Sequence, residues 1–266
     1  MTQRFAIAIA VLVGLPCTTP ALGAQSIADR VSRAGNGTIR MTFATRPDVC
    51  GRGGNIHRGG NWHGNFGSDR NYSRDVEWDT VCDYGPGRLV LDKRDGEIAS
   101  VRFYIGGRWR QADSVTDLGN VPAKEASDYL VSLASTLPGK AGRDAIFPAT
   151  LADSAEPWPG LFRIARNDER PRETRKQAVF WLGQAAVEAA TAGLDSLSRD
   201  ANVDREVQNA VVFAFSQRPK DEGVPALIRI ARSHRDPEVR KQAVFWLGQS
   251  NDPRAIALFE ELLTKR

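Results

Sequence analysis

The hydrophobic pattern of the chain changes near residue 120, from alternating apolar positions to positions at helical spacing. In the helical part, the decamer Arg175–Gln184 (RKQAVFWLGQ) recurs letter for letter at Arg240–Gln249. Related segments lie before and between the two copies. One aligned alanine therefore recurs every 32 or 33 residues, at Ala145, Ala178, Ala210 and Ala243. A period within the roughly 20 to 50 residues typical of solenoids predicts a stack of similar structural repeats.

Each repeat is predicted to contain two helices joined by a short turn. The decamer places five apolar residues in a row, so its helix is apolar almost all round and needs cover on several sides. Stacked neighbouring repeats provide that cover. Asp236-Pro237 and Asp252-Pro253 supply the N-cap and first-position proline of two helices. First helices are predicted at 143–152, 172–184, 205–216 and 238–249, and second helices at 158–166, 186–198, 224–233 and 253–264.

The part before the repeats, residues 25–121, is predicted to be a β-rich module. Ile39, Met41 and Phe43 alternate with polar residues, which indicates a strand with one buried face. The clearest hairpin has strands at 88–92 and 99–105, joined through an Asp-Gly pair that favours the positive φ of a tight turn. We expect four or more short antiparallel strands in a small sheet or open barrel.

One helix, over residues 122–139, is predicted to connect the two parts. Pro122 can begin it, apolar residues recur within it at helical spacing, and Pro138-Gly139 ends it. The predicted fold class is therefore α+β. A small antiparallel β module with one disulfide comes first, and an all-α solenoid of about four helix pairs follows over residues 140–266.

Residues 1–24 have the features of a secretory signal peptide. Arg4 precedes an apolar run from Phe5 to Leu15, and small residues follow before position 25. That run is too short to span a bilayer, and no later stretch approaches the roughly 18 apolar residues that a span needs. We expect no membrane span, and export to the periplasm or the extracellular space.

Removal of the signal peptide would leave two cysteines, Cys50 and Cys82, in a compartment that permits oxidation. We predict a disulfide between them, with two free thiols as the alternative. The stretch 50–73 is rich in glycine and lacks periodicity, which predicts an irregular loop held at its base by the disulfide. His57 and His63 suggest a metal site there, but a closed zinc site needs four ligands and the disulfide consumes both thiols. We expect no metal and no cofactor.

The composition gives little support to a nucleic-acid partner. The chain has 266 residues, of which 41% are hydrophobic, enough for well-packed cores. Its formal charge is +4, but 36 basic residues stand against 32 acidic residues. Such a balanced mixture lacks the basic excess that nucleic-acid binding requires.

The segment Pro237–Gly248 (PEVRKQAVFWLG), the leucine-rich helix after it and the period of 32 or 33 residues resemble HEAT-type repeats. The likeness is to the short bacterial kind related to the phycobilisome-lyase repeats, and it covers 141–266. It implies a helical solenoid that acts as an interaction scaffold. Some members take part in lyase activity, but this sequence matches no catalytic residue of the family. Together with the features of a signal peptide, the resemblance leads us to expect a non-enzymatic, exported protein that binds another protein.

Arginines recur on the outward side of the second helices. Arg163 and Arg166 correspond to Arg229 and Arg232, two repeats further on. In HEAT arrays the second helices commonly line the concave surface, so we predict a basic groove for an acidic protein partner. The alternative is that these arginines are solvated and pair with nearby acids.

An envelope hydrolase is the alternative function, and Asp75, Glu77 and Asp79 would carry it. The strand predicted there places these acids in an outward row. Paired carboxylates are what a glycosidase requires, but such a row more often pairs with arginines on neighbouring strands, such as Arg40 or Arg102. The sequence contains no nucleophile elbow, phosphate loop or metalloprotease motif either, so no catalytic residue is assigned.

The last repeat keeps the sequence of an interior repeat, although end repeats usually carry polar caps. Its final apolar residues, including Phe259 and Leu263, lie close to Arg266. We expect an open apolar edge around Phe259 that binds a protein partner or a second copy of the chain.

Overall fold

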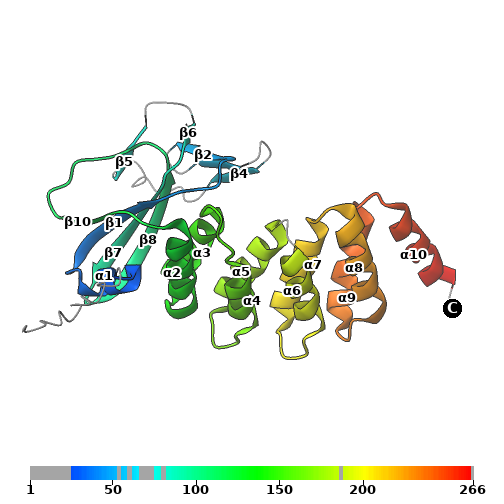
Figure 1. Ribbon diagram of the computed structural model, residues 1–266. Coiled ribbons are helices and arrows are strands. Elements are labelled where there is room, and N and C mark those ends of the chain that lie inside the picture. The colour runs from blue at the N-terminus through cyan, green and yellow to red at the C-terminus, as the bar shows by residue number, and fades with distance from the viewer. Residues whose placement is uncertain are drawn as a thin grey trace, which may run out of the picture.

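The computed structural model describes residues 25–52, 55–58, 62–65, 75–78, 82–185 and 188–264. The predicted signal peptide and Asp79 lie outside these residues. Strands gather at one end of the molecule, and helices run from them in a row toward the C-terminus (Figure 1). The α+β fold class predicted from the sequence is confirmed.

The larger sheet has four strands in the order β10-β1-β7-β8. They are β1 (Gly37–Phe43), β7 (Gly87–Arg94), β8 (Glu97–Ile105) and β10 (Val115–Asn120). The predicted hairpin is confirmed as β7–β8, with Asp95 and Gly96 in its turn at φ values of 52° and 82°. Strand β10 departs from the antiparallel expectation, because it pairs with β1 in parallel.

One face of this sheet is buried under helices. A short helix that the sequence pattern did not reveal, α1 (Ile27–Arg33), covers this face together with α3 (Gly139–Leu151). Helix α2 (Ala123–Thr136) contacts both of them. The side chains of the sheet that lie under these helices are almost inaccessible to solvent, among them Ile39, Met41, Phe43, Leu89, Leu91 and Phe103.

A second, smaller sheet contains the glycine-rich stretch. Its strands pair in the order β4-β3-β2-β6: β2 (Val49–Arg52), β3 (Asn55–Arg58), β4 (Trp62–Asn65) and β6 (Asp83–Tyr84). The prediction of an irregular loop is therefore wrong for these strands. Gly51 shows the physical reason, because a Cβ there would lie 2.8 Å from the Cβ of Ile105. This glycine allows β2 to approach β8 closely and does not mark a turn.

Cys50 and Cys82 form the predicted disulfide, with their Cα atoms 5.3 Å apart. The bond joins β2 to Cys82, the residue before β6. Strand β6 also pairs with β2 in the smaller sheet. A two-stranded ribbon, β5 (Val76–Glu77) with β9 (Arg108–Trp109), covers the outer face of the larger sheet, where it packs on Val90 and Tyr104.

Helices α3 to α10 form the predicted four helix pairs. After α3 they are α4 (Trp158–Arg166), α5 (Arg172–Gln184), α6 (Glu188–Arg199), α7 (Arg205–Ser216), α8 (Lys220–Ser233), α9 (Pro237–Gln249) and α10 (Pro253–Thr264). The first helices, α3, α5, α7 and α9, contact one another in series, and α4, α6, α8 and α10 lie in a second layer (Figure 1). Helix α2 contacts both α3 and α4, so it extends the second layer toward the sheet.

The β-rich part and the helical repeats share one continuous hydrophobic core. Helix α3 packs against β8, and Thr45 forms an isolated antiparallel bridge with Ala152. The Nε of Arg46 donates a hydrogen bond of 3.0 Å to the carbonyl oxygen of Thr150. The sheet therefore covers the first side of the array, as a preceding repeat would do.

Candidate interaction surfaces

The four arginines predicted to bind a partner are all exposed on second helices. Arg163 and Arg166 lie on α4, and Arg229 and Arg232 lie on α8. Three of them form ion pairs with acids beyond their own helix: Arg166 with Asp200, Arg229 with Asp195 and Arg232 with Glu261. Pairing with nearby acids, the alternative considered for the sequence, is therefore present, and it neutralises much of the positive charge on this surface.

A groove of about 630 Å³ separates α8 from α10. Apolar side chains, including Ile228 and Leu258, line part of it. Arg229, Arg232 and Arg254 lie at the same groove, and each is paired with an acid: Asp195, Glu261 and Asp252, respectively. Here the predicted arginines border apolar surface. Arg254 was not predicted from the sequence, although its place directly after the Asp252-Pro253 helix start puts it at the edge of α10.

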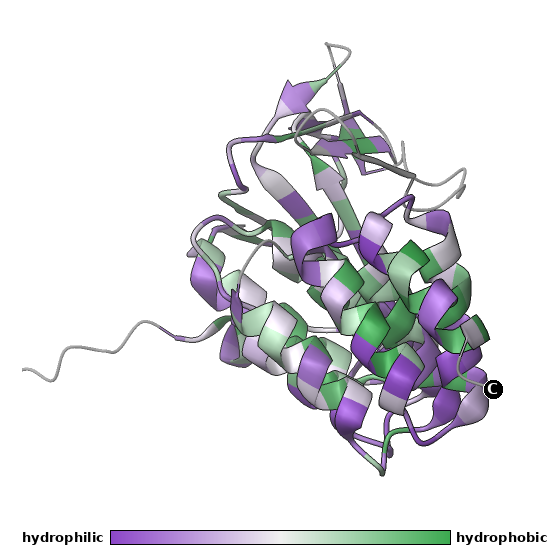
Figure 2. Cartoon of the chain, turned by 90° about the vertical axis from the view of Figure 1, so that its right-hand side faces the viewer, coloured by the Kyte–Doolittle hydropathy of each residue, from purple (hydrophilic) through white to green (hydrophobic). Residues whose placement is uncertain are grey.

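Exposed apolar side chains concentrate on the last two helices. Among the described residues, five large hydrophobic side chains are exposed, and four of them lie on α9 and α10: Phe245, Ile256, Leu262 and Leu263. Phe259, chosen from the sequence, is half-buried and packs against the core, because helical spacing puts it on the face of the buried Ala255. Figure 2 looks onto this end of the array, where hydrophobic segments lie on the nearest helices.

The predicted outward row of acids is wrong for Asp75, which is directed into the molecule. Its Oδ2 accepts a hydrogen bond of 2.8 Å from the Nε of Arg102 and one of 2.7 Å from the hydroxyl of Tyr104. The pairing with Arg102 considered from the sequence is thus confirmed. Arg40 pairs instead with Asp117 on β10, at 2.8 Å. The ribbon that carries Asp75 folds over the sheet, and this turns the carboxylate inward.

Asp92, on β7, also binds Arg102 and was not predicted from the sequence. It accepts hydrogen bonds from Arg102, from Ser100 at 2.8 Å and from Thr38 at 3.2 Å. Burial raises the pKa of Asp92, but the hydrogen bonds from Arg102 and Ser100 outweigh burial, and the pKa lies below its ordinary value. The hairpin register could have revealed Asp92, since it places this residue opposite Ser100.

These two carboxylates and one guanidinium form a structural ion-pair network. Burial, and then the hydrogen bond to Asp75, raises the pKa of Tyr104, so its phenol stays protonated at neutral pH. A glycosidase needs its two carboxyl groups on either side of the substrate bond, whereas the guanidinium of Arg102 lies between Asp75 and Asp92 and binds both. The arrangement favours a structural role for these acids over the hydrolase alternative.

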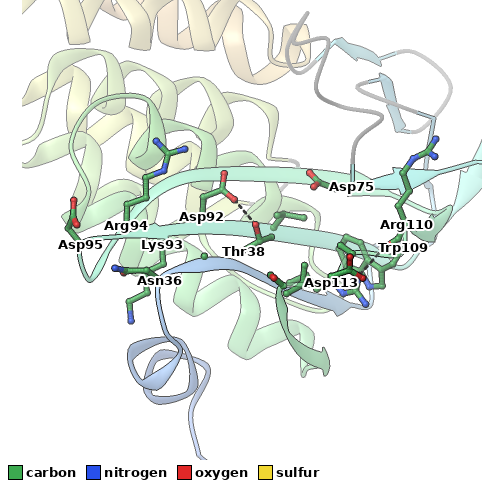
Figure 3. Close-up of a pocket in the computed structure, with 16 residues that line it drawn as sticks. Asn36, Thr38, Asp75, Asp92, Lys93, Arg94, Asp95, Trp109, Arg110 and Asp113 are labelled. Carbon is green, nitrogen blue, oxygen red and sulfur yellow. Dashed lines mark hydrogen bonds between the residues drawn. The ribbon is translucent and has the colours of Figure 1, made fainter.

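A hollow of about 900 Å³ lies beside this network, on the outer face of the larger sheet (Figure 3). The hydrogen-bonded pair of Asp92 and Thr38 lies between the hairpin turn at one end and Trp109, Arg110 and Asp113 at the other. The guanidinium groups of Arg40 and Arg88 lie 5.2 and 5.0 Å from the centroid of the Trp109 ring. The lining is balanced in charge, with Arg40, Lys93, Arg94 and Arg110 against Asp75, Asp92, Asp95 and Asp113.

Among the described residues, no cluster of three or more His, Cys, Asp or Glu side chains could hold a metal ion. Glu77 pairs with Arg108 at 3.2 Å and with Arg110 at 3.7 Å on the exposed ribbon. His57 and His63 are opposite each other in the backbone register of β3 and β4. None of the described helices is long and apolar enough to cross a membrane.

The two-layer stack of helix pairs defines the C-terminal part of the chain as an α-solenoid built from helical repeats. Residues 194–266 match the family model described as HEAT repeats. This part of the chain therefore carries HEAT repeats, as the resemblance of its repeated segments implied. No curated protein matches the chain.

Proposed function

We propose that this protein is an exported, non-enzymatic scaffold that binds a protein partner through the surface of its solenoid. The HEAT-repeat match supports a scaffold role. The observation that carries the proposal is the concentration of exposed apolar side chains on α9 and α10, beside the arginine-lined groove between α8 and α10. Contiguous exposed apolar surface usually marks an interface.

The α8–α10 groove suits a partner segment that carries both acidic and apolar residues. The guanidinium groups of Arg229 and Arg232 can each bind a carboxylate in bidentate geometry, whereas Arg254 already holds Asp252 through two hydrogen bonds. The apolar lining adds burial, which supplies most of the affinity. A partner's carboxylate would replace an acid that is already bound, such as Glu261 on Arg232. The arginines therefore contribute more to the selection of acidic partners than to the free energy of binding.

Export is supported by the disulfide and by the signal-like features of residues 1–24. Disulfides persist in oxidising compartments and are rare in the cytosol. Cell fractionation followed by mass spectrometry of the mature chain tests this part of the proposal. We expect the chain in the periplasmic or extracellular fraction, with its N-terminus near Gln25. A full-length chain confined to the cytosol would contradict export.

Affinity purification from native envelope extract tests partner binding. The double variant Arg229→Gln/Arg232→Gln should lose most of the captured partner, and circular dichroism should show an intact fold, because both side chains are exposed. Arg108→Gln/Arg110→Gln is the matched control, since these exposed arginines also form ion pairs but lie on the β-rich part, away from the groove. Equal capture by both double variants and the wild type would show that the groove does not bind the partner.

A further inference from the structure

The identical decamers in α5 and α9 place one side-chain surface in two environments. Helix α5 lies inside the array, between α3 and α7, whereas α9 contacts α7 on one side. Since the sequences of Arg175–Gln184 and Arg240–Gln249 do not differ, any difference in exposure comes from the neighbouring helices. The residues that are covered on α5 but open on α9 therefore define the surface that a helix beside α9 would cover.

On α5, that side is occupied by α7, and the two helices approach closely at Gly183. A Cβ on Gly183 would lie 2.8 Å from the Cβ of Ala214 and 3.1 Å from its Cα, closer than side chains pack. The glycine and the facing alanine thus form a small-residue contact between helices α5 and α7. These helices run in the same direction, because α6 returns the chain between them.

On α9, the equivalent glycine is Gly248, and no described atom lies within 4 Å of a Cβ placed there. Val244, one turn before Gly248, changes in the same way: it is half-buried, whereas its counterpart Val179 is buried. Phe245 is 52% exposed. In the described part of the chain, α9 thus presents the surface that α7 covers on α5, with nothing on it.

Helix α10 extends the same open site. Within the array, α7 contacts α6 as well as α5, so a helix on α9 would also meet the second helix of the last pair. That helix is α10, and it exposes Ile256, Leu262 and Leu263. Two observations, the open glycine position and the exposed side chains of α10, therefore point to one docking surface, defined by Phe245, Gly248, Ile256, Leu262 and Leu263.

We propose that this surface binds an α-helix of the partner protein, parallel to α9 and in the position that α7 occupies on α5. This inference rests on the proposed scaffold function. Helix α7 defines the chemistry of the ligand. Its buried residues are Val207, Gln208, Val211, Val212, Ala214 and Phe215. The partner helix carries a small residue opposite Gly248, flanked by apolar residues at the same helical spacing.

A second copy of the chain fits this site less well. Helix α7 of a second copy is covered by α5 and α9, and α3 is covered by the sheet. A two-fold dimer through α9 would pair this helix with itself in antiparallel orientation, since the two-fold axis would cross the helices. Helices α5 and α7, which meet at Gly183 and Ala214, run parallel, so an antiparallel pair of α9 helices would not reproduce this contact.

A matched pair of glycine variants tests the geometry. Gly183→Leu should lower the melting temperature, because the new side chain meets Ala214. Gly248→Leu should leave the melting temperature unchanged or raise it, because the position is open and leucine favours helix more than glycine does. Equal destabilisation by the two variants would show that Gly248 is covered, and this would overturn the proposal.

A labelled, hydrocarbon-stapled peptide with the α7 sequence, residues 204–217, serves as the probe for binding, with the staple on the solvent side. Fluorescence anisotropy should show binding to the wild-type protein, and binding about tenfold weaker or more to Gly248→Leu. A peptide with leucine in place of Ala214 should lose affinity to a similar degree. Binding of equal strength to wild type and Gly248→Leu, or no binding of the stapled peptide, would overturn the proposal.

Two further outcomes separate this inference from the scaffold proposal. If Gly248→Leu captures the envelope partner as well as the wild type, but Arg229→Gln/Arg232→Gln does not, the scaffold function holds and the helix site on α9 is wrong. If light scattering shows a wild-type dimer that Gly248→Leu dissociates, the occupant is a second copy of this chain, and the partner-helix proposal is overturned.

Discussion

Arg205, the first residue of α7, binds Asp236, the N-cap residue of α9, with 2.6 Å between Nε and Oδ2. Asp236 also caps its own helix, because its Oδ1 accepts a hydrogen bond from the backbone nitrogen of Glu238. The same contact occurs one repeat earlier, where Arg172 begins α5 and lies 3.9 Å from the N-cap Asp204. Each contact joins the start of one first helix to the start of the next, and so fixes the stacking of the repeats.

Replacing Asp236 with alanine should therefore lower the melting temperature by a few degrees, because it removes a helix cap and a contact between repeats together. Differential scanning calorimetry measures the change. Asp128→Ala is the control, since Asp128 pairs within its own helix, with Lys124 four residues before it. An Asp236 variant no less stable than the Asp128 variant would show that the contact between repeats contributes little.

Acid should weaken the last helix pair through Asp252. Hydrogen bonds from the side chain and backbone of Arg254 lower the pKa of Asp252 to about 2, from an ordinary value of 3.8. A carboxylate with a lowered pKa stabilises the fold fully above its unfolded pKa, and this contribution is lost as the pH falls through the folded pKa. Asp252→Asn should thus be less stable than wild type near neutral pH, and the gap in melting temperature should close between pH 4 and pH 2. A gap that stays constant over that range would contradict the assignment.

Removal of the disulfide should destabilise the β-rich part. The bond closes a loop with a sequence separation of 32 residues, for which the chain-entropy model gives about 3 to 4 kcal/mol. Urea denaturation of the double variant Cys50→Ser/Cys82→Ser measures this loss against wild type. Mass spectrometry after alkylation is the companion experiment. Two alkylated cysteines in the unreduced protein would contradict the bond.

Arg102 should matter more for stability than any exposed arginine. Arg102→Met leaves Asp75 and Asp92 together in a mostly buried site without a counterion, and breaking such a pair costs about 3 to 5 kcal/mol. Arg108→Met, on the exposed ribbon, should cost about 1 kcal/mol or less. Urea denaturation compares the two variants. Similar losses would show that the network on the outer face of the sheet is not a structural element.

Phe259 and Leu263, both on α10, should respond differently when each is replaced by a charged residue. Phe259→Glu should lower the melting temperature, because its ring is half-buried against the core, whereas Leu263→Glu should not, because Leu263 is 79% exposed. Both should weaken partner capture. Light scattering over a concentration series should show a monomeric wild type. A mass that rises with concentration, and that Leu263→Glu lowers, would favour self-association through this end.

Much of the architecture follows from the sequence, because the signals that define it are local. The recurring alanine and the decamer fix the helical period, and the ranges of the first helices agree closely with α5, α7 and α9. The turn at Asp95 and Gly96 needs positive φ, which these residue types tolerate, so the β7–β8 hairpin was predictable. The disulfide was predictable because only two cysteines follow the signal-like segment.

The candidate sites depended on contacts between distant segments, and these carry no local signature. The sequence pattern placed Asp75 on an outward face, but the ribbon that carries it folds onto the sheet and brings it to Arg102. Gly51 belongs to a stretch that resembles a loop, yet its missing side chain makes room for Ile105. In both cases the position of a partner strand decides the role of the residue.

The two decamers separate what the sequence determined from what only the tertiary structure decided. Ten identical residues form a helix of the same length in α5 and α9, because helix formation depends on local spacing and caps. Their exposure differs, because burial depends on which helices pack beside them. Gly183 meets Ala214 of α7, whereas Gly248 meets nothing among the described residues, and only the three-dimensional arrangement distinguishes a core position from a docking surface.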